Sequence, residues 1–282
     1  MMLTYPAKRF NELGDYFKFL ERNFTLAKFN PNLPIIARID GRAFHQFCKG
    51  LEKPFSTSFM ECMKETCQGL GKEYNPLLIY VQSDEITLVF TGNYMFGGTV
   101  QKYISNLASS TTAYFNQAVH RHIPHKANQL PTFDCRVFQV TSIQEAFENI
   151  VWRQIDASKN SVTLLASAYF SHTQLHSKNT QMKKEMLLEK GIDWNEYDKT
   201  NQHFTRGAFF KRTMVEKQVD FPLSDKAIAA NPNIYIKEGE YYVNRTEWQE
   251  ITVPRLSKIV EGTDIEKRII NHIFLEAIYE TV

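Results

Sequence analysis

Two short polar segments of this 282-residue chain contain carboxylates at positions where they could act together. Asp40 follows the apolar run 34–39, and Asp84 follows the apolar run 77–81. Each run predicts a buried strand, so each carboxylate is expected at a strand end. Two carboxylates held side by side repel one another unless a cation lies between them, and hard oxygen ligands of this kind suit Mg²⁺ bound jointly with substrate phosphates. The pair therefore predicts the metal arrangement of phosphoryl and nucleotidyl transfer.

The elements that must position these carboxylates follow from hydrophobic periodicity and turn residues. Up to residue 140 the order is strand, helix, strand, strand, helix, strand, with Asp84 at the tip of the central hairpin. This is the ferredoxin-like order of polymerase palm domains, in which the strands that end at Asp40 and Asp84 are neighbours. The predicted strands cover 34–40, 77–81, 86–90 and 133–140, and the predicted helices cover 56–73 and 99–121.

Beyond residue 142 the pattern is mainly helical, with two strand segments over 207–214 and 240–243. We place a domain boundary near residue 140, which separates a catalytic palm domain, 1–140, from a C-terminal domain, 141–282. The predicted fold class is α+β, a ferredoxin-like palm with a mainly helical C-terminal extension.

The amino-acid composition restricts the possible functions less than these motifs do. With 43% hydrophobic and 23% charged residues the chain is an ordinary globular protein, and its net charge of +2 is too small to indicate nucleic-acid binding by itself. No apolar stretch approaches the roughly 20 residues that span a bilayer, so we expect neither membrane insertion nor export. The four cysteines lack zinc-type spacing, which indicates reduced thiols in a cytoplasmic protein.

Several single residues have both a chemical and a structural interpretation. Gly41 could let its backbone approach a metal or a phosphate, or it could serve a turn. Lys53 could meet a triphosphate as a point charge, or it could be a solvated loop lysine. Lys102 and Ser105, near the start of a helix, could bind phosphate or simply flank the core.

Basic residues with aromatic neighbours occur twice in the C-terminal half. One group surrounds Arg153, and the other lies between residues 204 and 212. Such a mixture suits contacts with an RNA backbone and stacking on its bases, although ordinary surface charge has the same composition.

In these segments the chain resembles the tRNA-histidine guanylyltransferase family and, within it, the guanylyltransferase-like 3′-to-5′ RNA polymerases. The resemblance spans residues 5 to about 215. The segments that carry it are 38–45, 53–54, 82–85, the helix with Lys102 and Ser105, 133–137, 152–156 with Asn160, and 206–207.

The resemblance implies a set of site residues. Two Mg²⁺ ions would be held by Asp40, the carbonyl of Gly41 and Asp84, with Glu85 as a third catalytic residue that supports the metal carboxylates. The implied nucleotide site consists of Asp40, Gly41, Arg42, Ala43, Phe44, His45, Lys53, Ser83, Asp84, Lys102 and Ser105. The implied tRNA contacts are Arg136, Arg153, Gln154, Asn160, Arg206, Lys211 and Arg212.

The resemblance also implies a reaction and partners. In this family a tRNA 5′-monophosphate is activated with ATP, and the 3′-hydroxyl of an incoming nucleotide then attacks the activated end. ATP, GTP and other NTPs would be substrates, tRNA would be the partner of the C-terminal domain, and the protein would be a homotetramer.

One departure from the family pattern indicates which branch of the family the chain resembles. The guanylyltransferases proper carry a His-Ile-Asn-Asn-Leu-Tyr-Asn stretch where this chain has residues 158–164, and only Asn160 is retained. We therefore expect a Mg²⁺-dependent, template-dependent 3′-to-5′ nucleotidyltransferase that acts on truncated tRNA. The alternatives are a tRNA-histidine guanylyltransferase that adds one guanosine, a nucleotide cyclase, and a palm protein that only binds RNA or nucleotide.

Overall fold

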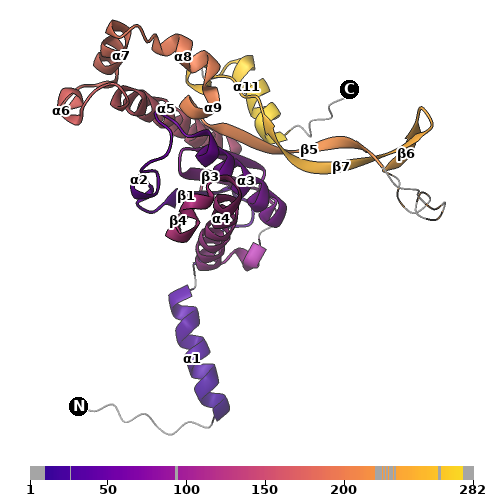
Figure 1. The fold of residues 1–282 in the computed structure, drawn as a ribbon. Coiled ribbons are helices and arrows are strands. Elements are labelled where there is room, and N and C mark those ends of the chain that lie inside the picture. The colour runs from indigo at the N-terminus through magenta and orange to yellow at the C-terminus, as the bar shows by residue number, and fades with distance from the viewer. Residues whose placement is uncertain are drawn as a thin grey trace, which may run out of the picture.

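A computed structural model gives the fold of the chain. It describes residues 10–25, 27–92, 95–219, 224, 226, 228, 231, 233–259 and 262–275. A single antiparallel sheet, with strand order β4-β1-β3-β2-β5-β7-β6, runs through the molecule. Helices pack on both faces of its palm half (Figure 1).

The first six elements of the body confirm the ferredoxin-like order and the α+β class. They are β1 (Ile35–Gly41), α3 (Thr57–Tyr74), β2 (Leu78–Gln82), β3 (Glu85–Phe90), α4 (Val100–His122) and β4 (Phe133–Gln139). The Ser56 side chain caps α3 by accepting a hydrogen bond from the amide of Phe59. A short helix, α2 (Phe44–Phe47), directly follows β1.

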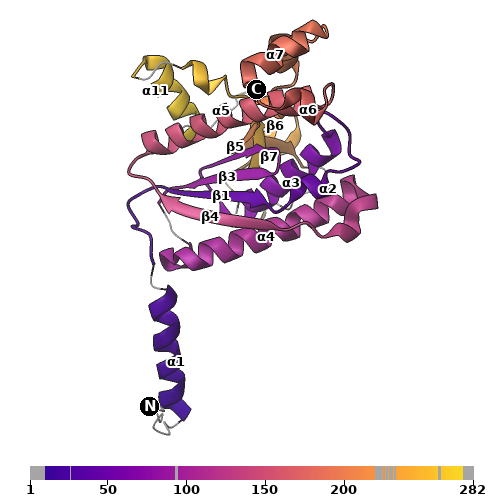
Figure 2. The same cartoon turned by 90° about the vertical axis from the view of Figure 1, so that its left-hand side faces the viewer.

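The two faces of the palm sheet pack against different helices. Side chains of α3 and α4 form one core with β1, β3 and β4, and Phe115 and Met63 lie at its centre without solvent exposure. The other face packs against α5 (Ile143–Ser167) through Phe147 and Ile150. Figure 2 shows α5 on one side of the sheet and α4 on the other.

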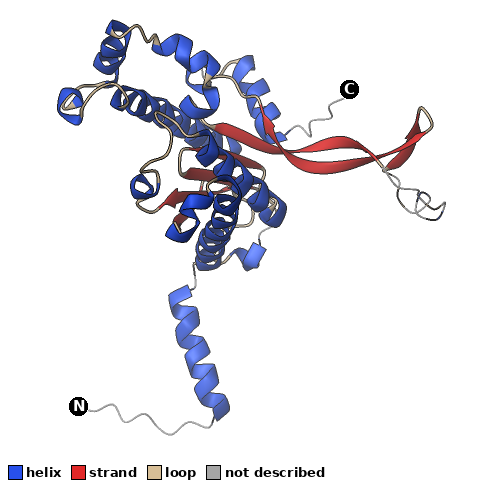
Figure 3. Ribbon diagram, viewed as in Figure 1, coloured by secondary structure: helices blue, strands red, loops and turns tan. Residues whose placement is uncertain are grey.

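The C-terminal half adds short helices and a long β-ribbon. The helices after α5 are α6 (His172–Leu175), α7 (Thr180–Glu189), α8 (Trp194–Thr200), α9 (Gln202–Thr205) and α11 (Asp264–Ile270). The ribbon consists of β5 (Ala208–Gln218), β6 (Ile234–Lys237) and β7 (Glu240–Ile251), and it projects from the body (Figure 3).

The strands β5 and β7 are longer than their local pattern predicts, because each pairs with the other along its length. The start of β5 also pairs with β2, where Val81 lies opposite Ala208. The sheet therefore continues across the predicted boundary near residue 140, and the division into two domains stays a prediction.

The helix α1 (Phe10–Thr25) stands away from the body (Figure 1) and exposes the aromatic rings of Phe17 and Phe19. Among the described residues, no helix is both long enough and apolar enough to cross a membrane.

Candidate active site

The strand register brings the predicted carboxylates to one end of the sheet. Asp40 on β1 lies opposite Glu85 on β3 and opposite Asp134 on β4. Asp84 occupies the two-residue turn between β2 and β3, and its carbonyl oxygen accepts a hydrogen bond from the amide of Gly41 at 3.1 Å. Asp40 and Asp84 are therefore neighbours at the same rim, as the predicted topology requires.

Neither of these two carboxylates is paired with a cation in the part of the protein that the structure describes. No ion pair within the described parts of the chain includes Asp40 or Asp84. Burial raises the pKa of the Asp84 carboxyl, and the negative charge of Asp40 raises it further, although hydrogen bonds from its own amide and from Ser83 lower it in part. The rim thus holds negative charge that an external cation would stabilise.

Glu85, next in the sequence, is in a different environment. Arg153 on α5 donates two hydrogen bonds to its carboxylate, at 2.6 and 2.7 Å, and both side chains are buried. Arg153 also contacts Asp156 at 3.1 Å, and Asp156 accepts a hydrogen bond from Asn160. Burial raises the pKa of Glu85, while the hydrogen bonds and charge of Arg153 oppose that rise.

The oxygen donors at the rim suit a Mg²⁺ ion that is bound jointly by the protein, water and substrate phosphates. Within the described residues, no group of three or more His, Cys, Asp and Glu side chains forms a closed metal site. Mg²⁺ usually keeps several waters and binds one or two carboxylates together with substrate phosphates, so Asp40, Asp84 and the Gly41 carbonyl suffice for that mode. A side chain at Gly41 would clash, since its Cβ would lie 2.3 Å from the ring of Phe44.

A cavity of about 280 Å³ opens beside Asp84, close to the lower end of the range for small-molecule sites. Its polar lining includes Lys53, Ser83, Asp84 and Asn160. Its apolar wall includes Phe55, which stacks on Phe204 of α9 with ring centroids 5.1 Å apart and planes 10° apart. A flat apolar wall next to a lysine and the Asp84 carboxylate can accept a nucleobase and, with a bound cation, a polyphosphate.

Not all predicted nucleotide-site residues face this cavity. In the segment after β1, Arg42 and His45 are exposed, Ala43 has a left-handed backbone with φ 54°, and Phe44 is buried in the core. The ring of Phe44 packs against Phe133 and Phe115 at centroid distances of 4.8 and 5.3 Å, so Phe44 supports the rim from inside.

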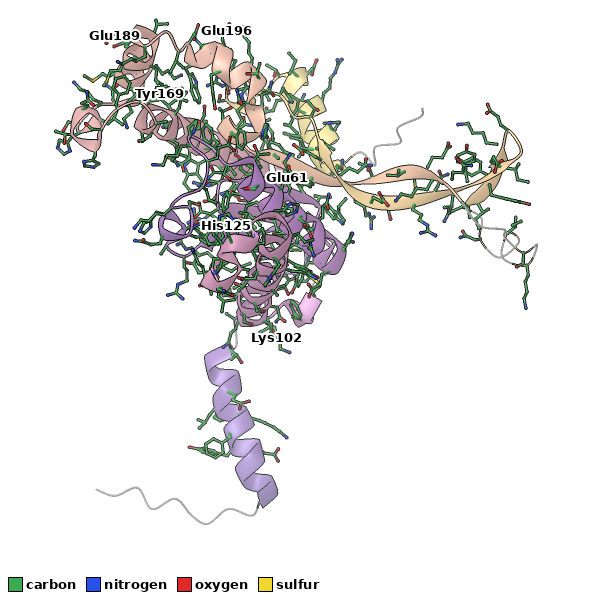
Figure 4. The ribbon with its side chains drawn as sticks, viewed as in Figure 1. Glu61, Lys102, His125, Tyr169, Glu189 and Glu196 are labelled. Carbon is green, nitrogen blue, oxygen red and sulfur yellow. The ribbon has the colours of Figure 1, made fainter. Side chains whose placement is uncertain are left out.

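Lys102 and Ser105 lie at the opposite end of the sheet from the carboxylates. The strand β3 runs away from the rim toward Phe90, so α4 begins at the far end, where the amide of Val100 donates to the carbonyl of Ala27. Figure 4 shows Lys102 near the point where α1 joins the body. A single chain does not bring these two residues to Asp40 and Asp84.

The predicted RNA-contacting residues divide into buried and exposed groups. Gln154 accepts a hydrogen bond from the amide of Leu256 at 2.8 Å, and Lys211 donates to the carbonyl of His272 at 2.7 Å. Like Arg153, these two side chains are buried, and the structure does not present them to RNA. Arg206 is bound to the buried Asp198. The exposed members of the set are Arg136, Asn160 and Arg212.

Sequence reasoning missed Phe55 and Asp198, which are far apart along the chain and have no local signal. It considered Phe204 only as an aromatic neighbour of basic residues. It also missed Arg38, although the signal was present. Alternate residues of a strand share a face, so Arg38 must lie on the same face of β1 as Asp40.

Comparisons with known proteins point to one family. The family model described as tRNA(His) guanylyltransferase matches residues 14–141. The chain is 26% identical to a tRNA(His) guanylyltransferase of Schizosaccharomyces pombe over 194 residues, which cover 64% of this chain and 74% of that protein. It is 25% identical to an uncharacterized protein of Acanthamoeba polyphaga mimivirus over 211 residues, which cover 65% and 72% of the two chains.

A solved structure extends the similarity over nearly the whole chain. A bacterial tRNA(His) guanylyltransferase (Thg1)-like protein in complex with ATP is 29% identical, with a TM-score of 0.73, over 94% of this chain and 100% of that chain. A bacterial protein of the same description in complex with GTP has a TM-score of 0.68 and 27% identity. The family model, the sequence relatives and the solved structures therefore all give the same similarity, to the tRNA(His) guanylyltransferase family of nucleotidyltransferases.

Proposed function

We propose that this protein is a Mg²⁺-dependent nucleotidyltransferase that extends the 5′ end of truncated tRNA in the 3′-to-5′ direction, guided by the opposite base of the acceptor stem. The observation that carries the proposal is the pair Asp40 and Asp84, which lacks a cationic partner among the described residues. Asp84 also lines a cavity whose wall includes Lys53. The ATP and GTP in the similar bacterial structures support an NTP as the occupant of that cavity.

Each residue at the rim has a task in this proposal. Asp40, Asp84 and the Gly41 carbonyl would hold two Mg²⁺ ions. When bound, the ions lower the pKa of the attacking 3′-hydroxyl and neutralise charge on the leaving phosphate. Lys53 binds the triphosphate, and the stacked Phe55 and Phe204 orient the base.

Arg153 takes a positioning role in place of a direct RNA contact. It fixes the carboxylate of Glu85, which is the first residue of the hydrogen-bonded strand β3 and adjoins Asp84 in the sequence. Because the Asp84 turn is tied to this buried ion pair, its carboxylate stays in place when the metal and the nucleotide leave. Direct contacts with tRNA are then made by the exposed Arg136, Asn160 and Arg212.

The choice of truncated tRNA over tRNA-histidine rests on the stretch 158–164. This stretch lies on α5, and three of its residues, Asn160, Ser161 and Leu164, line the nucleotide cavity. A different sequence here changes the wall against which the nucleotide binds, so pairing with the template base becomes the means of selection. The curated relatives that are tRNA(His) guanylyltransferases favour the alternative, addition of one guanosine.

The remaining partners follow from the resemblance. We propose a cytoplasmic homotetramer, and the exposed rings of Phe17 and Phe19 on the isolated helix α1 support an oligomer.

The deciding experiment offers the enzyme tRNAs that lack the first 5′ nucleotide, with Mg²⁺ and all four NTPs. The base opposite the missing nucleotide is varied over all four types, full-length tRNA-histidine competes in the same reaction, and the 5′ ends are sequenced. We expect the Watson–Crick partner to be added in each case. Guanosine added regardless of the opposite base would establish the alternative, and Asp84→Asn serves as the inactive control.

A further inference from the structure

The face of the palm sheet that packs against α5 is left partly open over β4 and β1, beside the active site. On this face the strand register forms successive rows across β4, β1 and β3. The first row consists of Asp134, Asp40 and Glu85, and the second consists of Arg136, Arg38 and Thr87. In Figure 2 the strands β4 and β1 face the viewer, and no described helix lies in front of them.

The second row carries positive charge that the described protein leaves largely uncompensated. Arg38 and Arg136 are directly opposite on antiparallel strands, an arrangement of like charges that is unfavourable by itself. Arg136 has only a long contact to Asp134, at 3.8 Å, and Arg38 is in no ion pair of the described residues. The nearby Glu85 is engaged by Arg153. Two adjacent guanidinium groups suit a phosphate.

An exposed aromatic ring borders this row. Trp152 on α5 is 51% exposed, although the other two tryptophans, Trp194 and Trp248, are only 2% and 6% exposed. Its ring lies 5.8 Å from the guanidinium carbon of Arg38 and 4.5 Å from that of Arg153. Because Arg153 is fixed by Glu85, the indole is held in place while half of its surface faces solvent.

We propose that Trp152, Arg38 and Arg136 form the docking surface for the 5′ end of the RNA substrate. The two guanidinium groups bind a backbone phosphate, and the indole stacks on the terminal base of the acceptor stem. The arginine row is about 7 Å from the Asp40 row along the strands, so an RNA end bound here adjoins the metal carboxylates. This inference rests on the proposed function, because it takes RNA as the substrate.

The single exposed tryptophan provides a direct test. Truncated tRNA is titrated without NTPs or Mg²⁺ while tryptophan fluorescence and RNA anisotropy are recorded, and ATP is titrated separately. We expect RNA, and not ATP, to quench the wild-type emission. Trp152→Phe should lose the quenching and keep RNA affinity within a few-fold, because phenylalanine still stacks. Trp152→Ala should weaken RNA binding about 10-fold with unchanged ATP binding.

A second measurement examines the arginines. The dependence of RNA affinity on salt should be shallower by about one unit of log–log slope in Arg136→Gln than in wild type. Wild-type RNA affinity in Trp152→Ala, or equal quenching by ATP alone, would overturn the proposal. Because these assays involve no catalysis, failure of nucleotide addition with normal quenching would instead refute the proposed function and leave the docking surface intact.

Discussion

Carboxylates at the rim of the palm and carboxylates buried in the interior of the protein have different partners. In the interior, Glu85 is bound by Arg153 at 2.6 and 2.7 Å, and Asp198 is bound by Arg206 at 2.9 Å. At the rim, Asp84 is adjacent to Glu85 in the sequence but is in no ion pair of the described residues, and the nearby charge of Asp40 has the same sign. The comparison teaches that a carboxylate with an arginine partner serves the structure of the fold. A carboxylate without such a partner is available to bind an external cation.

The largest effect should come from removing a rim carboxylate. We expect Asp40→Asn and Asp84→Asn each to reduce nucleotide addition about a thousandfold, because charge stabilisation of the reacting phosphates is lost. Single-turnover addition to 5′-truncated tRNA measures this change. The exposed Asp264→Asn on α11 is the matched control and should retain full activity. Near wild-type rates in either rim variant would show that the rim carboxylates do not act in catalysis, which contradicts the comparison.

Removing the buried guanidinium group of Arg153 should lower the stability of the protein. Arg153→Ala leaves Glu85 buried without a partner, and we expect a loss of about 3–5 kcal/mol in the free energy of unfolding, measured with urea. The double variant Glu85→Gln with Arg153→Met should recover most of that loss, since no charge remains buried. Arg212→Ala, which removes an exposed arginine, should cost only about 0.5 kcal/mol, the usual size of a surface substitution. Equal stability of Arg153→Ala and wild type would contradict the structural role of the ion pair.

The charge of Lys53 should matter for nucleotide use and not for folding. We expect Lys53→Ala to raise the KM for ATP roughly 10-fold, because a positive charge near the triphosphate is lost, and Lys53→Arg to restore it in part. Steady-state kinetics of activation across ATP concentrations gives the values. The exposed Lys178 is a control, and Lys178→Ala should leave KM unchanged. If Lys53→Ala matches this control, Lys53 is a solvated loop residue.

The smallest effect concerns the pH dependence of stability. The pKa of Asp84 is raised in the folded, metal-free protein, so its ionised form weakens folding at neutral pH. Asp84→Asn should therefore raise the melting temperature at pH 7 by about 2–4 °C, which corresponds to about 1 kcal/mol. As the pH falls through the raised pKa toward the unfolded value, Asp84 becomes protonated in both states and the difference should disappear. Scanning calorimetry at several pH values measures the two melting temperatures. A difference between them that stays constant with pH would contradict this account.

Local patterns predicted those parts of the molecule that depend on local physics. The palm elements follow from periodicity and capping, and the topology alone made Asp40 and Asp84 neighbours. The burial of Arg153 was not predictable, because its partner Glu85 is distant in sequence and an arginine beside a tryptophan has the composition of a surface site. The position of Lys102 could not be predicted from a helix start alone, because the direction of β3 sets that start at the far end of the sheet. Its role in nucleotide binding stays a prediction.

The claim that Asp40 and Asp84 form a divalent-cation site is tested most directly by metal binding to the protein alone. Mn²⁺, which carboxylate sites accept in place of Mg²⁺, is titrated into the protein, and free Mn²⁺ is followed by electron paramagnetic resonance with Mg²⁺ as competitor. The account predicts that wild type and Asp264→Asn bind Mn²⁺ in competition with Mg²⁺, and that Asp40→Asn and Asp84→Asn lose this binding. Unchanged Mn²⁺ binding in Asp84→Asn would contradict it.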